Sequence, residues 1–148
     1  MDYEKAIWNA LRAVWVDVTV RGCWFHFNQC IYRRANGLEL SKSMLDGEDT
    51  WKMIKRLMTL SLIDHKNIKP VFLKLKQHYQ ETINDPNFDG VKKLFDYYEA
   101  QWIIGCAKTF EPKDYSCYKQ QIRTTNIAEN WNGRIFKEGP IMHCGAFI

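Results

Sequence analysis

Apolar residues recur at helical spacing near the start of the chain. They form one stripe that comprises Tyr3, Ala6, Ile7, Ala10, Leu11 and Val14. Apolar positions three or four apart are typical of a helix with one buried face. We therefore expect a helix here whose stripe faces the core. Trp8 falls on the polar side of this helix, with Glu4, Lys5, Asn9 and Arg12, so another part of the protein must cover it.

A strand and a second helix are predicted next. Residues 18–25 are rich in β-branched and aromatic types, which favours a strand. The apolar face of the following helix comprises Phe27, Cys30, Ile31, Arg34 or Ala35, and Leu38. Gly37 can end this helix. A lone strand needs partners for its backbone hydrogen bonds. We therefore expect partner strands from an upstream part of a longer chain or from another chain.

Three more helices are predicted between a polar loop at 41–49 and residue 102. Their apolar faces comprise Trp51, Ile54, Leu57, Met58 and Ser61; Ile68, Val71, Phe72, Leu75 and Tyr79; and Val91, Leu94, Phe95, Tyr98 and Trp102. Pro70 is tolerable in the first turn of the second helix. Residues 84–90 are predicted to form the turn before the third.

The C-terminal part is less periodic. Residues 105–123 are expected to form a connection that carries one short strand. The last helix would start near Asn126, with Ile127, Trp131 and Ile135 facing inward. From Gly139 onward the sequence has no period and reads as a tail.

Composition narrows the class of protein. At 148 residues, 46% of them hydrophobic, the chain is long and apolar enough for one folded domain. No apolar run approaches the ~18 residues that span a bilayer. The acidic, amphipathic start is unlike a secretory signal, and five irregularly spaced cysteines favour a reducing, intracellular compartment. A net charge of +4 is compatible with a nucleic-acid partner and does not demonstrate one.

Two carboxylates near the ends of the chain have alternative interpretations. Asp2 precedes a helix and can cap it, or it can be a metal ligand of a nucleotidyl transferase. If Asn126 caps the last helix, Glu129 stands where a capping-box Glu bonds back to the cap. Alternatively, Glu129 binds metal opposite Asp2, with Arg123 near a phosphate. The residues alone do not separate these uses.

Cys23 and His26 form a Cys-x-x-His pair, which is half of a zinc site. Residues that could complete it stand at no recognised spacing; they are Cys106, Cys117, His143 and Cys144. We therefore do not expect zinc. The simpler interpretation is a cysteine packed in the core and a histidine bonded to a nearby carboxylate or carbonyl.

Basic residues could follow a phosphate backbone. The set comprises Arg21, Arg33, Arg34, Lys52, Lys55 and Arg56. For the lysines a solvated helix face is the preferred interpretation. Arg33 and Arg34 follow the Cys-x-x-His segment closely, so they are the better candidates for contacting DNA.

Three segments together resemble the Mutator-like (MULE) family of DNA transposases. They are the Asp-aromatic-Glu-x-Ala start at residues 2–6, the Gly-Cys-x-Phe-His-Phe-x-Gln block at 22–29 with Tyr32 and Arg33, and the Arg-Thr-x-Asn-x-x-Glu-x-Trp-Asn block at 123–132. The middle region also looks like the helical insertion of these proteins.

The resemblance implies an α/β, RNase H-like core, mostly helical in this chain. Residues 1–40 would be its second half, 41–106 an all-helical insertion, 107–138 a return segment and final core helix, and 139–148 a tail. Asp2 and Glu129 would be catalytic and would bind Mg²⁺ or Mn²⁺ for DNA cleavage and joining. Cys23, His26 and Asn126 would lie near that centre. Arg33, Arg34 and Arg123 would contact transposon-end DNA in the nucleus, and a homo-oligomer is possible.

The chain departs from the family because only Met1 precedes Asp2, so the first catalytic Asp is missing. We therefore expect a truncated transposase-derived protein with negligible strand-cleaving activity on its own. A domesticated, non-catalytic DNA- or protein-binding factor is the alternative. A helical interaction protein with a zinc knuckle is a third.

Overall fold

The computed structural model describes residues 3–15, 17–40, 49–82, 88–104 and 110–124. Helices account for 74% of these residues, and no strand or sheet occurs among them. The expected α/β, RNase H-like architecture is therefore wrong for the part of the chain described. That expectation came from the family resemblance together with the strand predicted at 18–25, and no strand pairing occurs among the residues that the structure describes.

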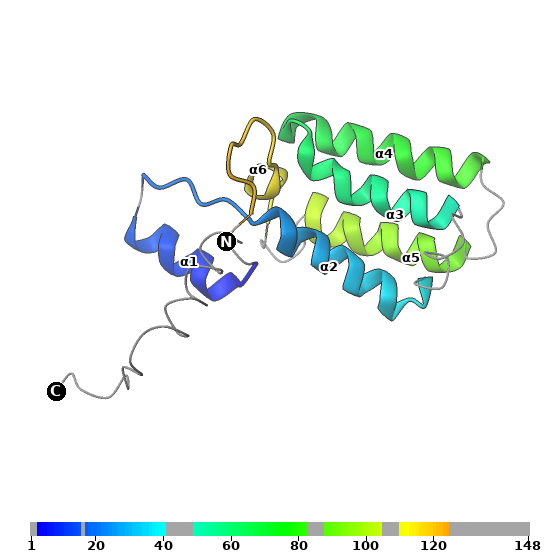
Figure 1. The fold of residues 1–148 in the computed structure, drawn as a ribbon, viewed down its shortest axis with the longest axis horizontal. Coiled ribbons are helices and arrows are strands. Elements are labelled where there is room, and N and C mark those ends of the chain that lie inside the picture. The colour runs from blue at the N-terminus through cyan, green and yellow to red at the C-terminus, as the bar shows by residue number, and fades with distance from the viewer. Residues whose placement is uncertain (1–2, 16, 41–48, 83–87, 105–109, 125–148) are drawn as a thin grey trace, which may run out of the picture.

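The described part of the chain is a succession of helices (Figure 1). In chain order they are α1 (Lys5–Val14), α2 (Trp24–Gly37), α3 (Asp49–Thr59), the 3-10 helix η2 (Leu60–Leu62), α4 (His65–Thr82), α5 (Phe88–Tyr98), the π-helical turn η3 (Glu99–Ile103) and α6 (Pro112–Tyr115). The predicted helices at the start and in the middle of the chain are confirmed.

The body of the molecule is a bundle of α2, α3, α4 and α5 (Figure 1). Helix α2 packs on both α3 and α5, and η2 turns the chain from α3 into α4. The buried side chains recur every three or four residues, as in Phe27, Ile31 and Ala35 of α2. Because this spacing puts them on one side of each helix, the bundle buries most of the predicted apolar faces.

Aromatic rings connect the bundle to the segments outside it. Phe27 of α2 lies at the centre: its ring stacks on Tyr115 of α6 at 4.8 Å between centroids and meets Trp102 of η3 edge-on at 4.9 Å. Trp102 in turn contacts Tyr3 at 5.0 Å, and Phe110 contacts both Tyr3 and Trp8. We call these six rings the aromatic cluster: Tyr3, Trp8, Phe27, Trp102, Phe110 and Tyr115.

The strand predicted at 18–25 is wrong. Residues 18–23 have no regular secondary structure, and α2 already begins at Trp24. Two backbone hydrogen bonds join this stretch of chain to residues about 90–100 positions later in the sequence. Gly22 N donates to Asp114 O at 2.8 Å, and Trp24 N donates to Arg123 O at 2.8 Å. These isolated bonds do not make a ladder, so β-branched composition alone did not produce a strand.

Helix α1 forms where predicted but buries the other side. Trp8, placed on the polar side by the sequence pattern, is 1% exposed and contacts Phe110. The predicted inward residues Ala6, Ile7, Ala10 and Val14 are exposed. Burial of the large Trp8 ring in the aromatic cluster therefore determines which side of α1 faces the core. It outweighs burial of the smaller side chains of the predicted stripe.

Three smaller predictions also need correction. Pro70 lies at the sixth residue of α4 and not in its first turn. Helix α5 begins at Phe88, inside the predicted turn at 84–90. The short strand expected within 105–123 is absent from the described residues 110–123, which instead contain α6 with Pro112 at its first position. Proline is favoured there because its fixed φ suits a helix start.

Gly22 allows the closest approach between the first residues of the chain and α2. A Cβ atom added at Gly22 would lie 2.1 Å from the hydroxyl oxygen of Tyr3 and 2.3 Å from its Cζ. The Tyr3 ring cannot easily move aside, because Trp102 and Phe110 contact it edge-on. A side chain at position 22 therefore has no room.

We predict that Gly22→Ala lowers the free energy of unfolding by about 1–3 kcal/mol, the usual cost of overpacking. Chemical denaturation measures this change. Gly37→Ala is the matched control, because nothing lies within 4 Å of a Cβ added there. In a Tyr3→Leu background, Gly22→Ala should cost much less. An equal cost in both backgrounds would show that Tyr3 is not what fills this space.

Candidate functional site

Cys23 and His26 lie at the start of α2. Cys23 is the residue before the helix, and its carbonyl oxygen accepts the first helical hydrogen bond, from Phe27 N at 3.0 Å. Its side chain is buried. His26 is half-buried in the first turn, with its ring edge-on to Phe25 at 5.3 Å. The pair therefore lies where the core meets the surface.

Cys117 lies near Cys23, although the two are far apart in sequence. Burial raises the pKa of the Cys117 thiol, and the neighbouring Cys23 raises it further. The positive charges of Arg123 and Arg21 lower this pKa and so act in the opposite direction. From the sequence, Cys117 is only one of the residues that could complete a zinc site, and its proximity to Cys23 is not predicted. Within the described ranges, no three His, Cys, Asp or Glu side chains are grouped as a metal site would require.

Two of the three arginines predicted to contact DNA lie in α2, and the third, Arg123, lies beside its first turn. Arg33 and Arg34 are exposed in the second half of the helix, and the guanidinium of Arg34 lies over the ring of Tyr97 at 5.3 Å. Arg123 is exposed beside the first turn, where its carbonyl oxygen accepts the bond from Trp24 N. None of the three has a carboxylate partner among the residues the structure describes.

Asp2, Glu129 and Asn126 lie outside the described residues. Their predicted convergence beside His26 therefore stays a prediction. Position 2 directly precedes Tyr3, which packs on Gly22, and Arg123 is bonded to Trp24. The two described segments that lead toward Asp2 and Glu129 thus meet the same short stretch of chain, residues 22–24.

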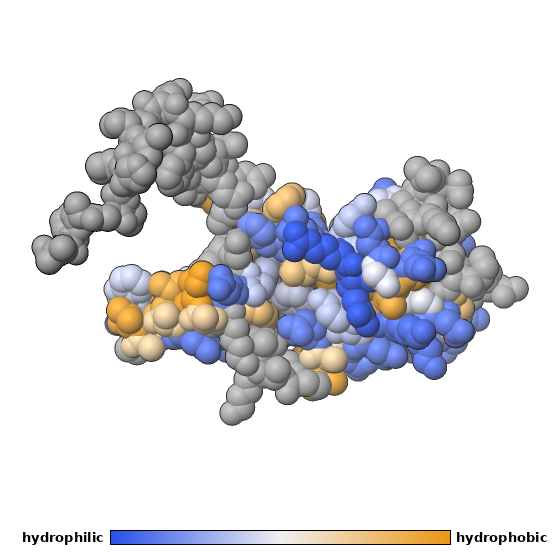
Figure 2. Space-filling model, turned by 90° about the horizontal axis from the view of Figure 1, so that it is seen from below, coloured by the Kyte–Doolittle hydropathy of each residue, from blue (hydrophilic) through white to orange (hydrophobic). Residues whose placement is uncertain are grey.

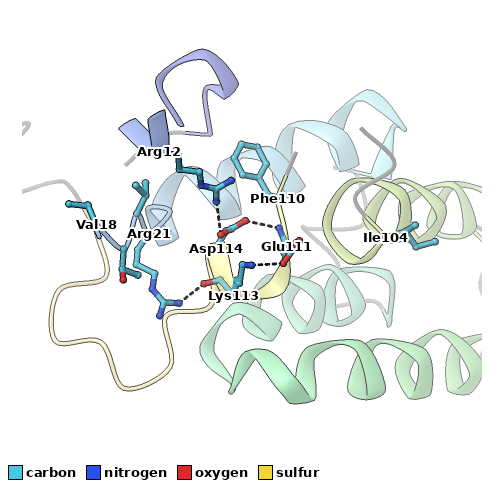
Figure 3. A pocket seen from close by; sticks show the side chains of 10 residues that line it. Arg12, Val18, Arg21, Ile104, Phe110, Glu111, Lys113 and Asp114 are labelled. Carbon is cyan, nitrogen blue, oxygen red and sulfur yellow. Dashed lines mark hydrogen bonds and ion pairs between the residues drawn. The ribbon is translucent and has the colours of Figure 1, made fainter. Parts of the chain in front are cut away.

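A cavity of about 730 Å³ opens beside this stretch (Figure 3). Residues of α1, the segment before α2 and the segment around α6 line it; they are Arg12, Val18, Thr19, Val20, Arg21, Ile104, Phe110, Glu111, Lys113 and Asp114. Its volume is in the range of ligand-binding pockets. Sequence periodicity does not reveal this cavity, because irregular segments that are distant along the chain form it.

Both carboxylates at the cavity are paired with basic groups (Figure 3). Asp114 is 5% exposed and accepts hydrogen bonds from Arg12 Nη2 at 2.8 Å and from Glu111 N at 2.9 Å. Lys113 Nζ pairs with Glu111 at 2.8 Å and lowers the pKa of that carboxyl. Arg21 donates to the Lys113 carbonyl oxygen and has no carboxylate partner within the described part. The cavity wall therefore carries a net positive charge.

No protein-family model, curated protein or solved structure matches this chain. Among the described residues, no helix is both long enough and apolar enough to cross a membrane.

Asp114 holds α1 and α6 together across the cavity, so its removal should be costly. We predict that Asp114→Ala lowers the free energy of unfolding by about 1–3 kcal/mol, because Arg12 and the Glu111 amide lose a buried acceptor. Lys113→Ala is the matched control: it removes an exposed ion pair and should change stability by less than about 0.5 kcal/mol. Thermal or urea unfolding measures both. Equal effects would mean that Asp114 does not bridge the two segments.

Proposed function

We propose that this chain is a DNA-binding protein of MULE transposase ancestry that contacts the phosphate backbone and does not cut DNA alone. The ancestry rests on the three sequence blocks at residues 2–6, 22–33 and 123–132. The contact residues in this proposal are Arg33, Arg34 and Arg123, the same residues that the resemblance implies.

The observation that carries the proposal is the charge along α2. Arg12, Lys52, Lys76 and Lys113 pair with carboxylates. Arg33 and Arg34 of α2, and Arg123 beside its first turn, have no carboxylate partner within the described residues. Exposed lysines such as Lys66 of α4 also lack one, so the distinguishing feature is three exposed arginines at one helix. Arginine can donate two parallel hydrogen bonds to a phosphate, so exposed guanidinium groups favour a phosphate partner.

The spacing of these arginines suits a duplex. Arg123 lies against Trp24, and Arg33 is nine residues further along α2. At 1.5 Å per residue, this separation is about 14 Å along the helix axis. That length is about four base-pair steps of a DNA strand. This axial separation therefore matches the spacing of phosphates along one strand.

The described residues give no support for strand cleavage. In the family it needs carboxylates to hold Mg²⁺, which stabilises the charge that develops during transfer. The residues that would hold it, Asp2 and Glu129, lie outside the described residues. The carboxylates described near the start of α2, Asp114 and Glu111, already neutralise Arg12 and Lys113. Binding is therefore the function that the described geometry supports best.

We predict that duplex DNA binding by the full chain weakens steeply with salt and needs no divalent metal. Each phosphate contact contributes about 0.9 to the slope of log K against log[salt]. Neutralising all three residues in Arg33→Gln/Arg34→Gln/Arg123→Gln should therefore lower the slope by about 2–3. Fluorescence anisotropy with a labelled duplex, titrated in EDTA at several salt concentrations, measures the slope.

A variant with the same change in net charge separates a specific surface from a general attraction. Lys66→Gln/Lys69→Gln/Lys74→Gln removes three exposed charges from α4. Its slope should stay close to that of the unmodified chain. Equal loss in both variants would contradict a surface along α2. Mg²⁺-dependent DNA nicking that disappears in Asp2→Ala would contradict the non-catalytic part of the proposal.

A further inference from the structure

The outward side of α2 carries a row of aromatic, amide and basic side chains. We call Phe25, Gln29, Tyr32, Arg33 and Asn36 the α2 stripe. At 100° per residue, they fall within an arc of about 100° around the helix axis, on the side away from the residues that α2 buries. Phe25 is 45% exposed and Tyr32 is 41% exposed. Two large rings therefore face solvent on the same side of α2 as Arg33.

The surface around these rings is hydrophilic, and α2 itself carries no negative charge. Figure 2 shows hydrophilic residues over most of the bundle, whereas apolar residues gather at the end of the molecule that carries α1. Helix α2 contains no Asp or Glu. The side-chain amides of Gln29 and Asn36 have no hydrogen-bond partner among the described residues. The α2 stripe therefore presents flat rings beside amides and a guanidinium group, which suits a polar, anionic partner with flat faces.

Unpaired bases have this chemistry. In a duplex the bases stack on one another, so a groove presents only their edges to a protein. A single strand leaves the base faces free to stack on aromatic side chains, while its phosphates still attract basic groups. We propose that the α2 stripe stacks on unpaired bases, so that single-stranded DNA is the preferred ligand of this surface. This inference rests on the proposed DNA binding, because Arg33 and Arg123 supply the phosphate contacts.

The spacing of the rings suits one strand. Phe25 and Tyr32 are separated by about 10 Å along the axis of α2. That length is about three nucleotides at the 3.4 Å step of a stacked strand. Arg33 follows Tyr32 directly, and Arg123 is bonded to Trp24, the neighbour of Phe25. Each ring therefore has an arginine beside it, so one strand can meet a ring and a cation at both ends of the α2 stripe.

The test is fluorescence anisotropy of the full chain in EDTA with two labelled probes, an oligothymidine of about 12 nucleotides and a blunt duplex of the same length. Phosphate contacts alone would favour the duplex, whose charge density is higher. We expect tighter binding to the oligothymidine. Tyr32→Leu should weaken this binding about fivefold or more, because stacking on one base is lost. The variant should leave duplex binding nearly unchanged, and its salt slope should not change, because no phosphate contact is removed.

Three further variants separate stacking from other effects. Phe25→Leu should lose affinity for the oligothymidine as Tyr32→Leu does, whereas Tyr32→Phe keeps the ring and should bind like the unmodified chain. Trp15→Leu is the matched control, because it removes a ring that is 55% exposed at the end of α1. It should leave both affinities unchanged. An equal loss in Trp15→Leu and Tyr32→Leu would overturn the inference, as would an equal loss of duplex and oligothymidine binding in Tyr32→Leu.

The stacking inference and the proposed DNA binding fail in different ways. Salt-dependent duplex binding with no preference for the oligothymidine would overturn the stacking inference and leave the arginine contacts to phosphates intact. Absence of binding to both probes would overturn the proposed DNA binding and the stacking inference together.

Discussion

The ring of Phe27 is the contact on which the arrangement of this molecule depends. It belongs to α2 in the bundle, stacks on Tyr115 of α6 and touches Trp102 of η3. Through Trp102 and Phe110 the same contacts reach Tyr3 and Trp8, so the first and last described segments are fixed on one end of α2. Aromatic pairs at these separations add stability beyond the area that they bury. The cavity and the start of α2 take their shape from this packing.

Much of the fold follows from the sequence because helices need only local information. Apolar residues at i, i+3 and i+4 predicted α2, α3, α4 and α5 with most of their buried residues. The orientation of α1 could not be predicted the same way. More apolar residues lie on the predicted stripe of α1 than on the side that carries Trp8. The burial of the Trp8 indole, however, depends on Phe110, about a hundred positions away along the chain, and local periodicity does not reveal that contact. The strand at 18–25 failed for the same reason: a strand needs a neighbour, and its composition cannot say whether one exists.

The candidate site was predictable residue by residue but not in its geometry. The Cys-x-x-His spacing drew attention to the start of α2, and Arg33 and Arg34 lie exposed further along that helix. Neither the proximity of Cys117 to Cys23 nor the Arg12–Asp114 pair has a sequence signal, since both join segments that are distant along the chain. The lining of the cavity includes three basic side chains and two carboxylates, a surplus of one positive charge.

Native-state amide hydrogen exchange tests most directly whether the aromatic cluster unites these segments. If it does, the amides near Trp8 in α1, those near Phe27 in α2 and those of residues 115–117 should open together. Their opening free energies should then agree within about 1 kcal/mol, as expected of one cooperative unit. Opening of α1 at a much lower free energy than α2 would contradict this, because it would show that the rings of Tyr3 and Trp8 do not bind the N-terminal segment to the bundle.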